Sequence, residues 1–142
     1  MRFILCSAAL IYKFLPRSPL KLQETGPRCW REWKRAADLA GTRATVKYTV
    51  PGPMTLVDGM VNIHYDSEAD LHADLVKCIN QELLGLVSAG CTHVQIDEPV
   101  LMRYPDKAMS YGLDNLDKCL EGIPDTVTKV KCFKSQTHQV RK

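Results

Sequence analysis

The chain has 142 residues, which is enough for one compact domain but too few for a complete (β/α)8 barrel of about 200–250 residues. Its 45% hydrophobic and 25% charged residues provide for an apolar core, so disorder as the main state is excluded. The net charge of +3 is small and the basic residues are scattered, which gives no argument for nucleic-acid binding.

The first 28 residues show no clean hydrophobic periodicity and are interrupted by prolines, so the sequence predicts an irregular leader over 1–28. A mostly apolar run over 3–12 is too short to cross a bilayer, which takes about 20 apolar residues. Two interpretations of this run stay open. It is either the core of a secretory signal peptide, although no clear small-x-small cleavage site follows it, or a buried strand or helix segment.

The six cysteines are widely and irregularly spaced and form no CxxC pair, so a zinc-ribbon site has no support. An even number of cysteines in a short chain is also typical of a disulfide framework. Cys78 and Cys119 fall on the apolar faces of predicted helices, where cysteine acts as a small hydrophobic residue. We therefore expect reduced thiols and a cytoplasmic protein.

From residue 29 the pattern becomes regular. The sequence predicts a helix over 29–39, with both tryptophans on one side and Gly41 at its end. Alternating apolar residues over 46–50 predict a strand, which the Pro-Gly-Pro turn at 51–53 ends because proline cannot donate to a ladder. A short helix is expected within 54–62.

The clearest element is a helix over 68–89. Ser67 is a suitable N-cap, and Glu68 and Asp70 in the first turn suit the helix dipole. Apolar residues then recur every three or four positions, and Gly90 follows at the C-cap position.

The remaining elements are a strand over 93–97, a helix over about 115–121 and a strand over 127–133, followed by a basic tail at 134–142. Strands that alternate with helices indicate βαβ units, and hence a parallel sheet with right-handed crossovers. The sequence therefore predicts an α/β protein whose three strands at 46–50, 94–97 and 127–133 pair in parallel, with the 68–89 helix outside them.

The segment HVQIDEP carries the main chemical prediction. Because strand residues alternate between two faces, its two apolar residues should pack on helices, while Gln95 and Asp97 point to the opposite, site-bearing face. Asp97 ends its strand, where active sites lie in such folds, and its carboxylate could bind a substrate ammonium or merely cap the turn before Pro99. Glu98 should point away from Asp97, towards a neighbouring loop or helix terminus.

Other motifs are less specific. The Pro-Gly-Pro turn at 51–53 either brings main-chain groups close to a ligand or is only a rigid turn. Asp97 and Glu98 face opposite ways and so do not form a glycosidase pair, which needs two carboxylates about 5–9.5 Å apart across one sugar. His64, His72 and His93 have no partner at a metal-ligand spacing, and Cys132 lies six residues before His138 in the basic tail.

Taken together, VKYTVPGPMTL, INQELLGLVSAGC and HVQIDEPVLMRYP resemble the C-terminal catalytic barrel of the cobalamin-independent methionine synthases, from about Cys29 to Lys129. The resemblance implies that 29–133 is a partial (β/α)8 TIM barrel with parallel strands. It also implies methyl transfer from a methyltetrahydrofolate to the thiol of homocysteine, with a zinc ion that activates the thiol.

Three residues are the candidate substrate-binding residues. In the resemblance, Asp97 matches the aspartate that binds the amino group of homocysteine or methionine, and Thr55, with the turn at 51–53, matches the loop near the folate. Gln95 shares the site-bearing face with Asp97. The tryptophan that stacks on folate in the classical enzymes would fall near Gly59, where this chain has none.

The zinc site departs from the family pattern. The family's first two ligands form a His-x-Cys on the strand after the IDEP unit, whereas this chain has Val130-Lys131-Cys132 there, which leaves Cys132 as the single candidate ligand. The sequence stops resembling the family after Lys129, and the other ligands come from later strands. We therefore expect a truncated barrel, by splicing or otherwise, that is inactive on its own.

Two alternative functions stay open. A partial barrel exposes strand edges and could act as a non-catalytic interaction module that pairs with another chain or with itself. The chain could also be a relative of uroporphyrinogen decarboxylase, which resembles this barrel superfamily and needs no metal. The pairing of TVPGPMT with IDEP favours the methionine synthase interpretation, with small-molecule substrates and neither nucleic acid nor membrane as partner.

Overall fold

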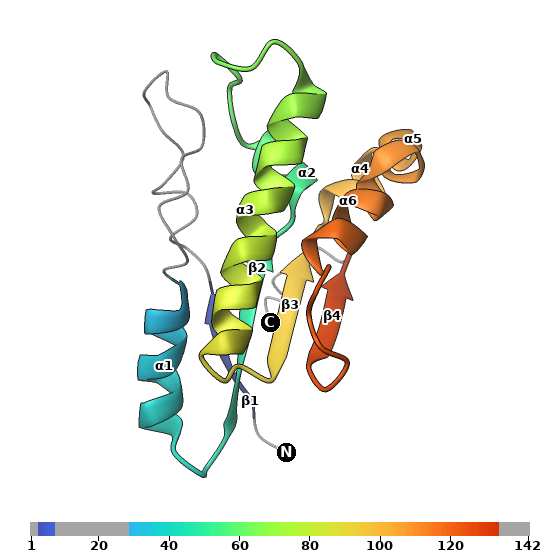
Figure 1. Ribbon diagram of the computed structural model, residues 1–142. Helices are drawn as coiled ribbons and strands as arrows, with labels where there is room; N and C mark the ends of the chain where they lie inside the picture. Colours follow the sequence, from blue (N-terminus) through green and yellow to red (C-terminus); the bar gives the residue numbers. More distant parts are fainter. Residues whose placement is uncertain (1–2, 8–28, 134–142) are drawn as a thin grey trace, which may run out of the picture.

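The structure is a computed structural model that describes residues 3–7 and 29–133, in which a parallel sheet is covered by helices (Figure 1). Its four strands are β1 (Phe3–Ser7), β2 (Thr45–Pro51), β3 (His93–Asp97) and β4 (Thr128–Cys132). They pair side by side in chain order, and every pair is parallel. The predicted parallel arrangement of the strands at 46–50, 94–97 and 127–133 is therefore confirmed.

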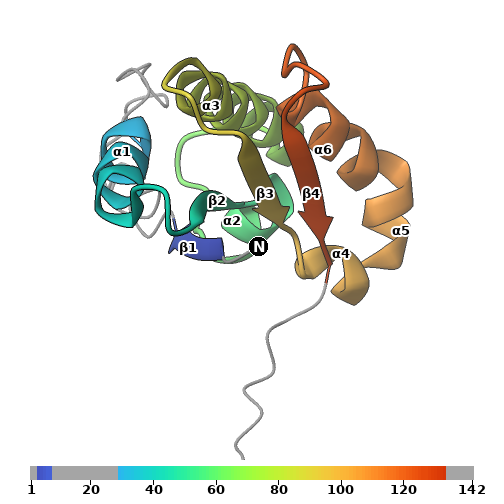
Figure 2. The same ribbon diagram turned by 90° about the horizontal axis from the view of Figure 1, so that it is seen from below.

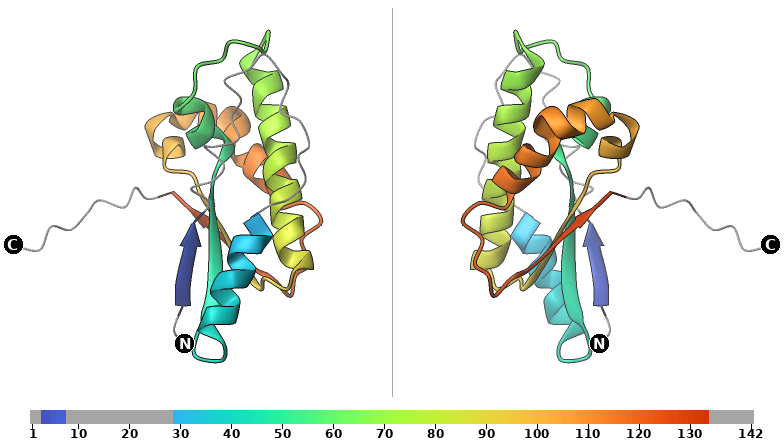
Figure 3. Two further views of the ribbon diagram at one scale, coloured as in Figure 1. Left: turned by 90° about the vertical axis from the view of Figure 1, so that its left-hand side faces the viewer. Right: turned by 90° about the vertical axis from the view of Figure 1, so that its right-hand side faces the viewer.

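The helical elements are α1 (Cys29–Ala40), α2 (Pro53–Asp58), α3 (Glu68–Ser88), α4 (Val100–Arg103), α5 (Pro105–Lys107), the π-helical η2 (Ala108–Gly112) and α6 (Leu113–Cys119). Seen along the sheet, α1, α3 and α6 follow one another around one side of it (Figure 2). The short helices α2, α4 and α5 gather at the carboxyl ends of the strands, towards which the arrows point (Figure 3). This is the arrangement of successive βα units in an open arc of a barrel.

Strand β1 extends the sheet beyond the sequence prediction. It lies within the stretch for which an irregular leader is expected, and it pairs in register with β2 from Phe3 beside Thr45 to Ser7 beside Thr49. The strand interpretation of the apolar run therefore holds for its first five residues. Residues 8–28 and 134–142 lie outside the described part of the chain, so the boundaries predicted at 28 and 133 stay predictions.

Helix α3 forms for the reasons that its sequence suggests. The Ser67 side chain accepts a hydrogen bond from the Asp70 main-chain nitrogen at 3.1 Å, and the predicted N-cap is confirmed. Gly90 has a φ of +102°, a conformation that glycine adopts without the penalty of a side chain, and it follows the end of the helix.

The core lies between α3 and the outer face of the sheet. The side chains of Tyr48, Val50, Val94 and Ile96 point to this face and are fully buried. They meet the apolar stripe of α3, which includes Leu75, Ile79, Leu83 and Leu86. Burial of one such aliphatic side chain contributes about 1.5–3 kcal/mol, so this layer is the main source of stability.

The chain between Val100 and Cys119 differs from the prediction of one short helix at 115–121. Four helical segments, α4, α5, η2 and α6, follow one another almost without interruption. Gly112 lies in a tightly packed place, where a Cβ would lie 2.6 Å from both Leu101 Cδ2 on α4 and Met54 Sδ on α2. The prediction assigned no regular element between the strand at 93–97 and the helix at about 115–121, and this interval contains Pro105 and Gly112, which are typical helix breakers.

Within the described residues, no helix combines the length and apolar character that crossing a membrane requires.

Candidate functional site

The predicted site residues lie at the carboxyl ends of β2, β3 and β4. Pro51, Asp97 and Cys132 are register partners across these three strands and form the last row of the sheet. In parallel α/β folds, ligands bind beyond this edge because the loops that follow the strands surround it.

Gln95 and Asp97 share one face of β3, as the alternation of strand residues predicts. The Gln95 Nε2 atom donates a hydrogen bond to Asp97 Oδ1 at 2.5 Å. Lys47, on β2, donates from Nζ to Gln95 Oε1 at 2.6 Å. The three side chains therefore form a connected polar row on the face opposite to the apolar core, and Lys47 is the member that sequence reasoning missed.

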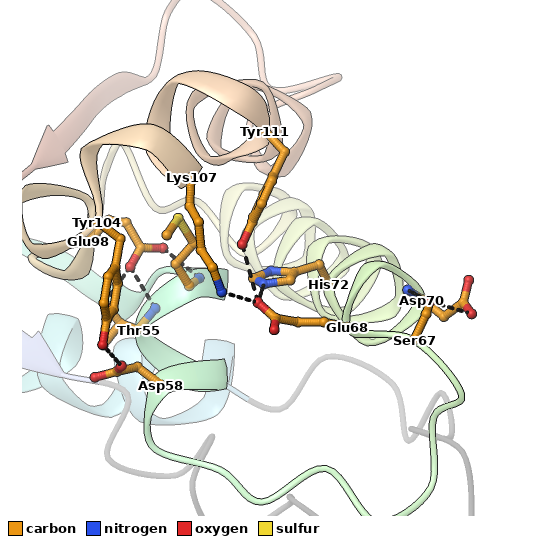
Figure 4. A network of polar contacts seen from close by, with 11 residues as sticks. Thr55, Asp58, Ser67, Glu68, Asp70, His72, Glu98, Tyr104, Lys107 and Tyr111 are labelled. Carbon is orange, nitrogen blue, oxygen red and sulfur yellow. Dashed lines mark hydrogen bonds and ion pairs between the residues drawn. The ribbon is translucent and has the colours of Figure 1, made fainter.

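Glu98 points away from this row, and the prediction that it reaches a helix terminus is confirmed. Its side chain is fully buried and lies at the start of α2 (Figure 4). It accepts hydrogen bonds from the main-chain nitrogens of Met54 at 2.9 Å and Thr55 at 2.6 Å, and from the Thr55 hydroxyl. The residue before α2 is a glycine with no side chain to cap the helix, so Glu98 supplies the cap from the position directly after β3.

Gly52 is the residue that makes room for this carboxylate. A Cβ at position 52 would lie 2.6 Å from Glu98 Cδ and closer still to Oε2, so a larger residue cannot be accommodated without moving Glu98. Main-chain hydrogen bonds also connect the carboxyl ends of β2, β3 and β4. The Gly52 nitrogen donates to the Asp97 carbonyl at 2.8 Å, and the Glu98 nitrogen donates to the Cys132 carbonyl at 2.7 Å.

Burial raises the pKa of the Glu98 carboxyl above its usual value, and the hydrogen bonds from Thr55 and Met54 counteract part of this rise. Three donors converge on its two oxygens, an arrangement that suits a hydrogen-bond acceptor. Thr55, predicted to lie near a folate, directs both its hydroxyl and its main-chain nitrogen at Glu98. In the described structure, Thr55 thus stabilises the turn between β2 and α2 through its hydrogen bonds to Glu98.

A second polar cluster joins the loops that follow β2 and β3 (Figure 4). Glu68, at the start of α3, accepts hydrogen bonds from Lys107 Nζ at 2.9 Å and from the Tyr111 hydroxyl at 3.2 Å. His72 Nε2 lies 3.6 Å from the same carboxylate oxygen, and its ring packs on Tyr111 with a centroid distance of 5.1 Å. The cluster lines a groove of about 700 Å³ between α3 and α6.

Charge and burial shift the pKa values within this cluster in a consistent way. The hydrogen bond from Lys107 lowers the pKa of the Glu68 carboxyl. Burial lowers the pKa of the His72 imidazole, because the residue has only 4% of its surface exposed, and the nearby Glu68 charge counteracts part of this effect. His72 therefore serves as a neutral packing residue between the two loops at neutral pH.

Two buried thiols, those of Cys29 and Cys119, are poorly suited to act as nucleophiles. Burial raises the pKa of both Cys29 and Cys119 to about 12, so neither forms a thiolate at neutral pH. These residues act as the small hydrophobic side chains that the sequence predicts for Cys119.

The residues present do not fit the zinc ion that the resemblance implies. Across residues 3–7 and 29–133, no three His, Cys, Asp or Glu side chains lie close enough together to hold a metal ion. Cys132 is the register partner of Asp97, but Val130 stands two positions before it, where the family has histidine. A tetrahedral zinc site takes about four ligands, and this part of the chain offers one.

Comparison with known proteins gives one consistent relationship. No protein-family model matches the chain. The methionine synthase of Thermococcus kodakarensis is 31% identical over 116 residues, which cover 82% of this chain and 32% of that protein. The methionine synthase of Pyrococcus abyssi is 30% identical over 126 residues, which cover 89% of this chain and 34% of that protein.

A solved structure agrees with the sequence relatives. The B12-independent methionine synthase of Shewanella sp. W3-18-1, in complex with selenomethionine, superposes with a TM-score of 0.68 and 26% identity, over 75% of this chain and 30% of that one. The chain spans about a third of the length of the curated relatives that it matches. By sequence, the chain is therefore similar to about a third of the length of these methionine synthases, and its fold matches part of the barrel of the B12-independent enzyme.

Proposed function

We propose that this chain provides the amino-acid-binding edge of a cobalamin-independent methionine synthase. The parent reaction transfers a methyl group from a methyltetrahydrofolate to the thiol of homocysteine. The observation that carries the proposal is the place of Asp97, whose partly exposed carboxylate ends β3 on the face away from the core.

The geometry around Asp97 suits a primary ammonium ligand. Within the described residues, the Asp97 carboxylate receives one hydrogen bond, which Gln95 donates to Oδ1, so Oδ2 can accept from a ligand. A charge-assisted hydrogen bond of this kind contributes about 1.5–3 kcal/mol. The selenomethionine in the related Shewanella structure supports methionine as the ligand to test.

We propose a folate-facing role for this chain but no zinc-binding role. The turn at Pro51 and Gly52, braced by Glu98, borders the same edge and supports a folate-facing role for the loop. In the parent reaction a zinc ion activates the thiol, and the described residues contain no group of side chains that could hold this ion. We therefore propose that the chain binds the amino acid but does not complete methyl transfer by itself.

Isothermal titration of L-methionine into the full chain tests the proposal. We expect saturable binding that Asp97→Asn weakens about tenfold or more, since one charge-assisted contact is lost. Asp114→Asn is the matched control, because Asp114 is an exposed carboxylate on α6 that pairs with Lys118 at 2.7 Å. Equal weakening by both variants, or no binding by the unmodified chain, would contradict the proposed function.

A further inference from the structure

Three side chains on the inner face of the sheet form a directed hydrogen-bond relay that ends on the proposed ligand-binding carboxylate. Lys47 contacts Gln95, and Gln95 contacts Asp97, at 2.6 Å and 2.5 Å. We infer that Gln95, held by Lys47, is a positioning residue that fixes Asp97 for an amino-bearing ligand and so determines selectivity for the amine. This inference rests on the proposed function.

The chemistry of the three groups allows one orientation of the Gln95 amide. A lysine ammonium carries donors only, so the atom that faces Lys47 must be the amide oxygen. The amide nitrogen then faces Asp97, whose ionised carboxylate can only accept. Reversing the amide would place an N–H group against the ammonium and an oxygen against the carboxylate, and both contacts would be repulsive.

Burial keeps this orientation in place. Gln95 is 8% exposed, and a buried amide is stable only when its donors and acceptors are paired. The contrast is Thr49, the register partner of Gln95 on β2, which is 6% exposed and whose hydroxyl has no hydrogen-bond partner among the described residues. Burial on this face alone therefore does not produce polar pairing, whereas the Gln95 amide is paired through both its oxygen and its nitrogen.

The two carboxylate oxygens of Asp97 have different roles. Oδ1 is occupied by Gln95, which fixes the plane of the carboxylate and leaves Oδ2 for a ligand at the end of the strand. A ligand with an ammonium group compensates the charge of Asp97, whereas a ligand without one leaves the carboxylate desolvated and unpaired. The predicted consequence is discrimination against the desamino analogue of methionine, methylthiobutanoate.

The experiment compares L-methionine with methylthiobutanoate by titration into the full chain and three variants. Gln95→Met keeps the volume but removes the amide, Lys47→Met removes the ammonium, and Thr49→Val is the matched control on the same face. We expect Gln95→Met to reduce the preference for methionine about tenfold, Lys47→Met to reduce it less, and Thr49→Val to leave it unchanged. The double variant Lys47→Met/Gln95→Met should match Gln95→Met alone, because both changes break one relay.

The outcomes separate the relay from the proposed function. If the unmodified chain shows no preference for methionine, both the proposed function and the relay are refuted. If the preference exists but survives in Gln95→Met, the relay alone is refuted. Should circular dichroism show that Gln95→Met does not fold, Lys47→Met decides, since Lys47 is partly exposed and tolerates an unbranched apolar replacement. An unchanged preference in that variant also refutes the relay.

Discussion

Replacing Gly52 by alanine should destabilise the chain by about 3 kcal/mol. The new Cβ would lie 2.6 Å from Glu98 Cδ, and a contact under 3.0 Å forces one of the two groups to move. Glu98 is fully buried, so a shift breaks hydrogen bonds to a carboxylate that water cannot replace. Hydrogen bonds to a charged group contribute about 1.5–3 kcal/mol each, and leaving a buried charge unpaired costs about 3–5 kcal/mol.

Gly59→Ala provides the matched control at the other end of the same helix. A Cβ there would meet its nearest neighbours at 3.7 Å and 3.8 Å, which is ordinary contact. The φ of Gly59 is −93°, which alanine adopts freely, so this variant should change stability by less than about 1 kcal/mol. Urea denaturation followed by circular dichroism measures both variants.

A double variant assigns the effect of Gly52→Ala to Glu98. Glu98→Ala removes the group that the new Cβ would strike, so Gly52→Ala/Glu98→Ala should be no less stable than Glu98→Ala alone. Additive losses in the double variant, or a Gly52→Ala loss no larger than that of Gly59→Ala, would refute the argument that Gly52 is required by the Glu98 carboxylate.

Three further predictions concern pH, assembly and metal. Burial lowers the pKa of His72 in the folded chain below its unfolded value of 6.5, so the folded state binds fewer protons and stability should fall as the pH drops below 6.5. His72→Phe should flatten this dependence in urea titrations between about pH 7 and pH 5, and an unchanged slope would contradict the assignment. The edge strands β1 and β4 each pair with one described strand, so size-exclusion chromatography should reveal oligomers, and a monodisperse monomer would contradict this expectation. Zinc should bind no more tightly than about micromolar in a competition assay with a chromogenic chelator, because one candidate ligand replaces the usual four, and stoichiometric tight binding would show that Cys132 has partners unaccounted for.

The features that the sequence predicted well have local causes. Helix α3 has a cap, an acidic first turn and an apolar stripe within its own residues, and the structure places it at Glu68–Ser88 against the predicted 68–89. The shared face of Gln95 and Asp97 follows from alternation alone. The direction of Glu98 follows from the same rule, since adjacent strand residues face opposite ways.

The features that the sequence missed depend on contacts between distant segments. Glu68 and Lys107 are 39 residues apart, and neither lies in a motif that indicates the other. Lys47 belongs to a simple alternating strand, and its contact with Gln95 requires the register of β2 against β3. The helical segments from Val100 to Cys119 contain Pro105, which starts α5 at a position that suits proline, and Gly112, whose close packing against Met54 depends on the tertiary structure.

The bond from Glu98 to α2 means that one βα unit of this arc is completed by the next. The donors at Met54 and Thr55 belong to the segment after β2. Their acceptor, Glu98, follows β3 and can reach them only when β3 pairs with β2. A protein divided anywhere between residues 56 and 97 would therefore leave an uncapped helix on one piece and a buried carboxylate without donors on the other. The β2 and β3 units therefore depend on each other for stability. We expect recombination of related chains to preserve the fold when the crossover lies outside this pair of units, and to disrupt it when the crossover lies between them.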